Sequence, residues 1–175
     1  AGIINLADLG RSLYDETHNE TCPYPWSGMN DKTYGIRTGE LVTFTSGAGM
    51  GKSSIMRELM YHIMHNTEDN IGVLAMEENT KQTAFNLMSV EANARLYIKE
   101  IRDQYTQEQL DDWQAKTIDS GRFFAFDHFG SIDNDEILGR VRYMAKALNC
   151  KWVFLDHLSI LVSGQEDNGD ERKSI

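Results

Sequence analysis

The sequence predicts an α/β fold, in which helices cover both faces of a mostly parallel β-sheet. Short apolar runs alternate with longer segments whose apolar side chains recur every three or four residues, the spacing of an amphipathic helix. Continuous apolar runs are typical of parallel strands, because both faces of such a sheet are buried. A glycine-rich turn between the first run and the first long helix is the third observation, and it bears on function as well.

Residues 1–25 are expected to be a lead-in that precedes this sheet. Its apolar side chains have the spacing of one short amphipathic helix: Ile4, Leu6, Leu9 and Leu13. Pro23 and Pro25 then favour extended backbone. Residues 26–175 are expected to form the N-terminal portion of the main domain, which we expect to continue beyond Ile175.

The remaining elements follow in alternation. Four runs are predicted to be strands: residues 41–45, 71–76, 123–126 and 152–155. Four helices are predicted: one from Lys52, one capped by Thr80 and running toward Ile98, one after a capping box at 106–109, and one opened by residues 133–136. The first and last helices should bury their apolar faces: Ile55, Met56, Leu59, Met60, Ile63 and Met64 on the first, and Ile137, Leu138, Val141, Met144, Ala145 and Leu148 on the last.

The composition narrows the classes of function. A net charge of −10 over 175 residues argues against a domain that coats nucleic acid non-specifically, because phosphate contacts need Lys and Arg. It leaves room for contact with DNA through a few loops. No apolar run approaches the roughly 20 residues of a membrane span, and no secretory signal is visible. Cys22 and Cys150 lack metal-ligand spacing and are expected to be reduced thiols in the cytoplasm.

A glycine-rich turn at residues 46–53 has the context of a phosphate-binding P-loop, between a predicted strand and a predicted helix. Glycines let successive backbone N–H groups point at phosphate oxygens, and the helix N-terminus adds partial positive charge. Lys52 can reach the β- and γ-phosphates, and the Ser53 hydroxyl can bind Mg²⁺. Ser46 stands where the full pattern has glycine. The residues expected at the nucleotide are Ser46, Gly47, Ala48, Gly49, Met50, Gly51, Lys52, Ser53 and Ser54.

Carboxylates follow two of the predicted strands. Asp156 ends the run at 152–155, the position of a Walker B aspartate that holds Mg²⁺ beside the P-loop. Glu77 and Glu78 follow the strand at 71–76, so we expect them at the same sheet edge, where open α/β sheets bind ligands. One of the two can activate the attacking water. An ordinary acidic pair at a helix start is an equally good interpretation, because the helix dipole favours it.

Five segments carry a family resemblance in their order and spacing: Ser-Gly-Met-Asn-Asp-Lys-Thr-Tyr-Gly at 27–35, Ser-Gly-Ala-Gly-Met-Gly-Lys-Ser-Ser at 46–54, Ala-Met-Glu-Glu at 75–78, Leu-Asp-His-Leu-Ser-Ile at 155–160 and Asp-Glu-Arg-Lys at 170–173. From residue 26 onward the chain resembles the helicase domain of phage primase–helicases, within the DnaB-type superfamily of hexameric replicative helicases. The resemblance implies a RecA-like P-loop NTPase fold. That family commonly lacks the first P-loop glycine, so Ser46 fits it.

The resemblance also implies residue roles. Lys52 and Ser53 match the phosphate and magnesium residues, Glu77 matches the catalytic base that polarises water, and Asp156 matches the Walker B position. The expected reaction is Mg²⁺-dependent hydrolysis of an NTP, ATP or dTTP, coupled to translocation on single-stranded DNA and to duplex unwinding. The segment from Asp156 toward Arg172 matches a region that approaches the DNA channel. Its acidic residues argue against direct phosphate contact there: Glu166, Asp167 and Asp170.

The implied partners are further copies of the chain in a hexameric ring, single-stranded DNA, and replication proteins such as primase and polymerase, in the cytoplasm of a bacterial host if the chain is phage-encoded. The family's sensor glutamine, arginine finger and other DNA loops are expected downstream of Ile175, and its primase and zinc-binding regions upstream of Ala1. The resemblance also implies that each site borrows an arginine from its neighbour in the ring, so an isolated copy is expected to bind nucleotide better than it hydrolyses it.

Two other functions fit the same residues. A RecA- or RadA-like recombinase or a clock-type ATPase would share the sheet, the P-loop and Asp156. A non-enzymatic, nucleotide-gated loader or assembly factor would share nucleotide binding without needing Glu77 as a base.

Overall fold

The computed structural model describes residues 5–15, 20–47, 49–127 and 134–156. Its centre is a three-stranded sheet with the order β4-β3-β5, in which β3 (Asn70–Ala75) pairs in parallel with β4 (Phe123–Ala125) and with β5 (Cys150–Asp156). The predicted parallel sheet is confirmed. Because the strands are parallel, the C-terminal ends of β3 and β5 reach one edge together.

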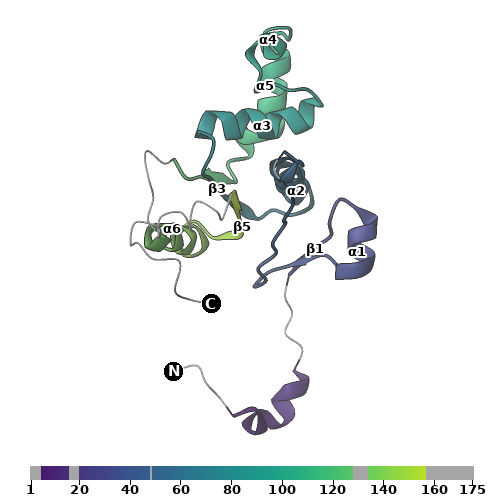
Figure 1. The fold of residues 1–175 in the computed structure, drawn as a ribbon, viewed down its shortest axis with the longest axis vertical. Helices are drawn as coiled ribbons and strands as arrows, with labels where there is room; N and C mark the ends of the chain where they lie inside the picture. Colours follow the sequence, from purple (N-terminus) through teal and green to yellow (C-terminus); the bar gives the residue numbers. More distant parts are fainter. Residues whose placement is uncertain (1–4, 16–19, 48, 128–133, 157–175) are drawn as a thin grey trace, which may run out of the picture.

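Helices cover both faces of this sheet (Figure 1). Helices α2 (Lys52–Asn66) and α3 (Thr80–Ala92) pack on one side, and α6 (Asn134–Lys146) packs on the other. The long central strand therefore has no solvent-facing side, which explains why its sequence is apolar without alternation.

Successive side chains of β3 point into two separate cores. Ile71, Val73 and Ala75 belong to the cluster beneath α2 and α3, whereas Leu74 belongs to the cluster beneath α6. This division follows from the period of two residues along a strand. Gly72 lies between them on the α6 side, where a Cβ would come within 2.7 Å of Met144 Sδ.

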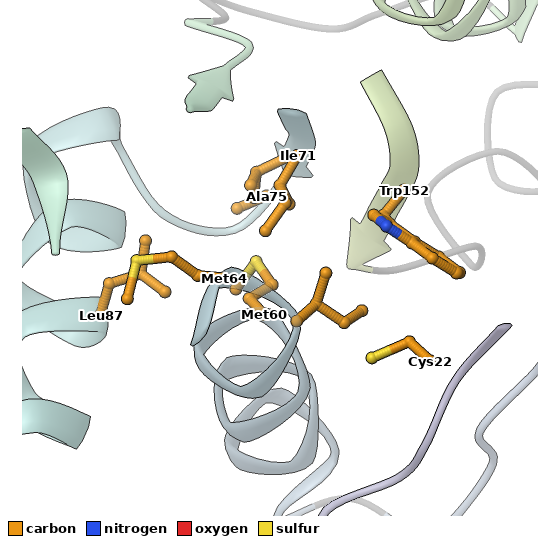
Figure 2. Packing of buried hydrophobic residues seen from close by; sticks show 9 residues of the cluster. Cys22, Met60, Met64, Ile71, Ala75, Leu87 and Trp152 are labelled. Carbon is orange, nitrogen blue, oxygen red and sulfur yellow. The ribbon is translucent and has the colours of Figure 1, made fainter. Parts of the chain in front are cut away.

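The larger core joins elements far apart in the chain (Figure 2). Met60 and Met64 of α2 point toward β3, and Trp152 of β5 and Leu87 of α3 complete the cluster. Cys22 reaches it from the N-terminal segment. The predicted buried face of the first helix is confirmed for Leu59, Met60, Ile63 and Met64, whereas Ile55 and Met56 are half-buried.

The chain between β3 and β4 forms a helical layer beyond α2. After α3 come α4 (Lys99–Arg102), α5 (Gln107–Lys116) and a 3₁₀ turn, η2 (Ile118–Ser120). The predicted capping box at the start of α5 is confirmed: the Thr106 hydroxyl accepts from the Gln109 backbone N–H, and the Gln109 side chain accepts from the Thr106 N–H.

Helix α3 differs from the prediction at both ends. Its N-cap is Asn79, whose side-chain oxygen accepts from Gln82 N at 2.9 Å, so Thr80 is the first helical residue and not the cap. The helix ends at Ala92 and does not run on to Ile98, because Asn93 adopts a left-handed conformation with φ of 47°.

The buried face of α6 was predicted only in part. Ile137 and Met144 are buried, and Val141 and Leu148 pack against the same core. Leu138 is 64% exposed and Ala145 is also exposed. The apolar stripe in the sequence is thus wider than the face that β3 and β5 cover.

The N-terminal segment forms a small unit of its own. Strands β1 (Thr21–Cys22) and β2 (Ile36–Arg37) pair antiparallel around α1 (Ser27–Thr33). Before them, η1 (Leu6–Tyr14) is a 3₁₀ segment interrupted at Gly10, where φ is 52°. The single amphipathic helix predicted here is therefore wrong, and Leu6, one of its expected apolar contacts, is 76% exposed. Ile4 lies outside the described residues.

The strand predicted at residues 41–45 is also wrong: this segment has no strand pairing. It lines one side of a cavity of about 700 Å³, and residues of β5 line the other. The segment thus lies along the open edge of β5 without making ladder hydrogen bonds to it, and Leu41 is 91% exposed.

Arg122 closes the C-terminal end of α2. Its guanidinium donates to the carbonyl oxygens of Met64 at 2.7 Å and Thr67 at 2.6 Å. A cation at this end of a helix also complements the macrodipole. We expect Arg122→Ala to lower the free energy of unfolding by about 2 kcal/mol, because charge-assisted bonds to helix-end carbonyls are lost.

Urea denaturation checks this expectation. Lys99→Ala is the control, because Lys99 forms an exposed pair with Asp103 and its loss should have little effect. Equal midpoints for Arg122→Ala and the wild type would contradict the assigned role.

Candidate nucleotide-binding site

The glycine-rich turn joins the 41–45 segment to α2. Gly49 and Gly51 have φ of 72° and 89°, a left-handed conformation that glycine adopts without steric cost. Gly51 is the N-cap of α2. The backbone thus reverses sharply and leads into a helix N-terminus, the arrangement in which N–H groups gather around an anion. Ala48 lies outside the described residues.

Lys52, the first residue of α2, folds back over this turn. Its ammonium donates to the carbonyl oxygens of Ser46 at 3.1 Å and Gly47 at 3.2 Å. The positive charge therefore lies at the loop that is predicted to hold phosphate.

Ser53 and Asp156 meet directly. The Ser53 hydroxyl donates to Asp156 Oδ2 at 2.6 Å, although the two residues are 103 positions apart. Asp156 is the last residue of β5, and Ser53 lies in the first turn of α2. The aspartate at the end of β5 therefore lies beside the glycine-rich turn, as its position in the sequence led us to expect.

The end of β3 lies at the same edge. Ala75 is aligned with Asp156 in the parallel register, and Met76 N donates to the Asp156 carbonyl at 2.7 Å. Glu77 follows immediately and is exposed. The predicted carboxylates therefore occupy one edge of the sheet, as parallel topology requires.

The two adjacent glutamates have different surroundings. Glu78 accepts from Arg57 at 3.2 Å, from Thr83 at 3.0 Å and from Asn86 at 2.6 Å. Its side chain is only 19% exposed. Their spacing after β3 did not separate Glu77 from Glu78, and the family resemblance implied a role for Glu77 alone; the structure assigns Glu78 to a polar cluster between α2 and α3.

Sequence reasoning missed Arg57, Thr83 and Asn86, the partners of Glu78. One signal was present: Thr83 and Asn86 are three residues apart on α3, and both are buried beside Leu87 and Met88. Polar side chains on an otherwise apolar helix face need partners.

The other residues predicted at the nucleotide are distributed along the turn and the helix. Met50 is 73% exposed, and Ser54 is exposed in the first turn of α2. The hydrogen bonds of Lys52 and Asp156 go to Ser46, Gly47 and Ser53, and not to Met50 or Ser54.

The donors at this edge fit Mg²⁺. A hydroxyl and a carboxylate are hard oxygen ligands, and the Ser53–Asp156 contact places them together. Within the described ranges, no group of three or more His, Cys, Asp or Glu side chains is placed to hold a metal. Two protein oxygens suit Mg²⁺, which keeps several waters and takes its remaining ligands from substrate phosphates.

Among the residues that the structure describes, no helix is long and apolar enough to cross a bilayer.

Comparison of the sequence with known proteins identifies the family of the chain. The family model of the DnaB-like helicase C-terminal domain matches residues 23–175, which include every site residue described above. The chain is 33% identical over 150 residues to a DNA helicase/primase of Enterobacteria phage T3. This match covers 85% of the chain but 26% of the relative, so the chain spans about a quarter of the relative's length. The resemblance read from the motifs is confirmed, and the chain belongs to the DnaB-like helicase C-terminal domain family.

Proposed function

We propose that this chain is the nucleotide-hydrolysing part of a replicative DNA helicase. In this proposal, residues 26–175 form the N-terminal portion of the NTPase domain, and residues 1–25 form a lead-in. Hydrolysis of an NTP drives movement along single-stranded DNA and unwinding of duplex. The observation that carries the proposal is the Ser53–Asp156 contact at the mouth of the P-loop turn.

The proposed binding of the triphosphate follows from the turn. Backbone N–H groups of the turn and the N-terminus of α2 would surround the phosphates, and the Lys52 ammonium would leave its carbonyl partners to bind the β- and γ-phosphate oxygens. Ser53 and Asp156 would hold Mg²⁺, the Asp156 carboxylate through water. Mg²⁺ held there would supply positive charge opposite the phosphate oxygens.

Glu77 is the proposed general base. Its carboxylate would accept a proton from water as the water oxygen bonds to the γ-phosphorus and the bond to the β-phosphate oxygen breaks. The exposure of Glu77 and the confinement of Glu78 support this choice between the two residues.

The proposed partners come from the family. A homo-oligomeric ring, hexameric in the proposal, would complete each site with an arginine from the neighbouring subunit. Single-stranded DNA would pass through the ring, and primase and polymerase would act with it. The T3 relative carries both helicase and primase in its name, which supports an association with primase.

The test uses the full-length protein with ATP and, separately, dTTP. We expect hydrolysis that single-stranded DNA stimulates, that EDTA abolishes, and that accompanies unwinding of a forked duplex. Strand exchange without unwinding would favour a recombinase. Nucleotide binding without hydrolysis under any of these conditions would favour a loader.

A further inference from the structure

Glu78 accepts hydrogen bonds from three side chains at this edge of the sheet. Both Arg57 and Asn86 donate to its Oε2, and Thr83 donates to its Oε1. Asn86 and Thr83 are 1% and 5% exposed. Buried donors of this kind lose hydrogen bonds when the acceptor moves, so the carboxylate is held in one place.

The three donors come from two helices, α2 and α3. Thr83 and Asn86 belong to α3, the helix that follows the Glu77–Glu78 turn. Arg57 belongs to α2, five positions after Lys52, or about 7.5 Å farther along the helix axis. A helix is stiff over this length, so Arg57 moves with Lys52 and Ser53.

Glu78 therefore connects the P-loop helix to the segment that carries Glu77. The backbone between β3 and the Asn79 cap of α3 is short, and Glu78 within it is bonded to both α2 and α3. Because Glu77 is the preceding residue, fixing Glu78 limits where the Glu77 carboxylate can lie relative to Lys52.

We propose that Glu78, held by Arg57, is a positioning residue that sets the location of Glu77 for the hydrolytic step. This inference rests on the function proposed above, in which Glu77 is the base. Misplacing a catalytic group by about 1 Å can lower a rate by about 100-fold without changing substrate affinity.

The decisive variant is Glu78→Gln. The amide keeps the size of the side chain, and an oxygen at the Oε2 position can still accept from Asn86 and Arg57. The negative charge that pairs with Arg57 is lost, and an NH2 group at the Oε1 position cannot accept from Thr83. We expect kcat for ATP or dTTP hydrolysis by the full-length protein to fall about 10- to 100-fold, with KM within about threefold of the wild type.

Arg57 supplies an independent variant. Arg57→Gln should reproduce the loss of kcat, and Arg57→Lys should restore part of it, because a cation again faces Glu78. The double variant Arg57→Gln/Glu78→Gln should be no slower than either single variant, because both remove the same connection.

Glu91 is the matched control. It also lies on α3, its side chain is 17% exposed, and it accepts a hydrogen bond from Tyr61 of α2. Burial, followed by the hydrogen bond to Glu91, raises the pKa of Tyr61 to about 12, so the hydroxyl stays protonated and donates at neutral pH. Glu91→Gln should disturb the α2–α3 contact and leave kcat within about twofold of the wild type.

The outcomes separate this inference from the proposed function. Suppose that Glu77→Gln abolishes hydrolysis, and that the kcat of Glu78→Gln equals the kcat of Glu91→Gln. Glu78 then only joins two helices, and the inference is overturned. If Glu77→Gln hydrolyses normally, the proposed base is wrong. If Glu78→Gln fails to fold, a wild-type kcat for Arg57→Gln overturns the inference by itself.

Discussion

Glu77→Gln is expected to lower the rate of NTP hydrolysis by about 10²- to 10⁴-fold, the contribution of a general base. Nucleotide affinity should stay within about threefold, because an amide of the same size removes only the ability to accept a proton. The free energy of unfolding should change by no more than about 0.5 kcal/mol, since Glu77 is exposed at the end of β3.

Steady-state hydrolysis and equilibrium binding of ATP and dTTP check this expectation together. Glu68→Gln is a suitable control, because Glu68 is also exposed but precedes β3, at the opposite end of the strand from Glu77. A Glu77→Gln protein with the wild-type rate would remove the catalytic assignment, and the nucleotide-gated loader would then be the better explanation.

Much of the fold and site could be predicted, because the signals are local or follow from topology. The apolar run of β3 and the helical spacing after Lys52 are short patterns that can be recognised from neighbouring residues alone. Parallel strands bring their C-terminal ends to one edge, and this rule predicted that Asp156 and the residues after Ala75 lie together, although they are far apart in the sequence.

What could not be predicted depends on packing. Asn79 and Thr80 both belong to residue types that favour the N-cap position. Which of them is the cap depends on which side chain accepts from Gln82 N, and in the structure this is Asn79. Residues 41–45 have the composition of a strand, but strand structure requires a hydrogen-bonded neighbour, and the cavity beside β5 separates the two.

The environment of Glu78 also depends on packing and could not be predicted. The family resemblance implied that Glu77 is the base, but it implied no role for Glu78, whose partners Arg57 and Asn86 lie on separate helices. These partners become visible only when α2 and α3 pack together. The role of Glu78 therefore depends on tertiary contacts and not on propensity.

Lys52→Ala is expected to weaken binding of ATP and dTTP by about 10- to 100-fold and to abolish measurable hydrolysis, because a charge-assisted bond to phosphate is lost. Stability should be unchanged. The carbonyl partners of Lys52, on Ser46 and Gly47, are on exposed residues, and water can replace the ammonium there.

Lys52→Arg makes the sharper comparison, because it keeps the charge. A lysine ammonium is compact, and here it lies within 3.1 and 3.2 Å of two carbonyls of one tight turn, whereas a guanidinium is planar and larger. We expect Lys52→Arg to bind nucleotide better than Lys52→Ala and still to hydrolyse it at least about 10-fold more slowly than the wild type. Isothermal titration and single-turnover hydrolysis measure the two effects separately. A fully active Lys52→Arg protein would mean that charge near the turn is sufficient, and the compact fit of Lys52 against Ser46 and Gly47 would then have no catalytic role.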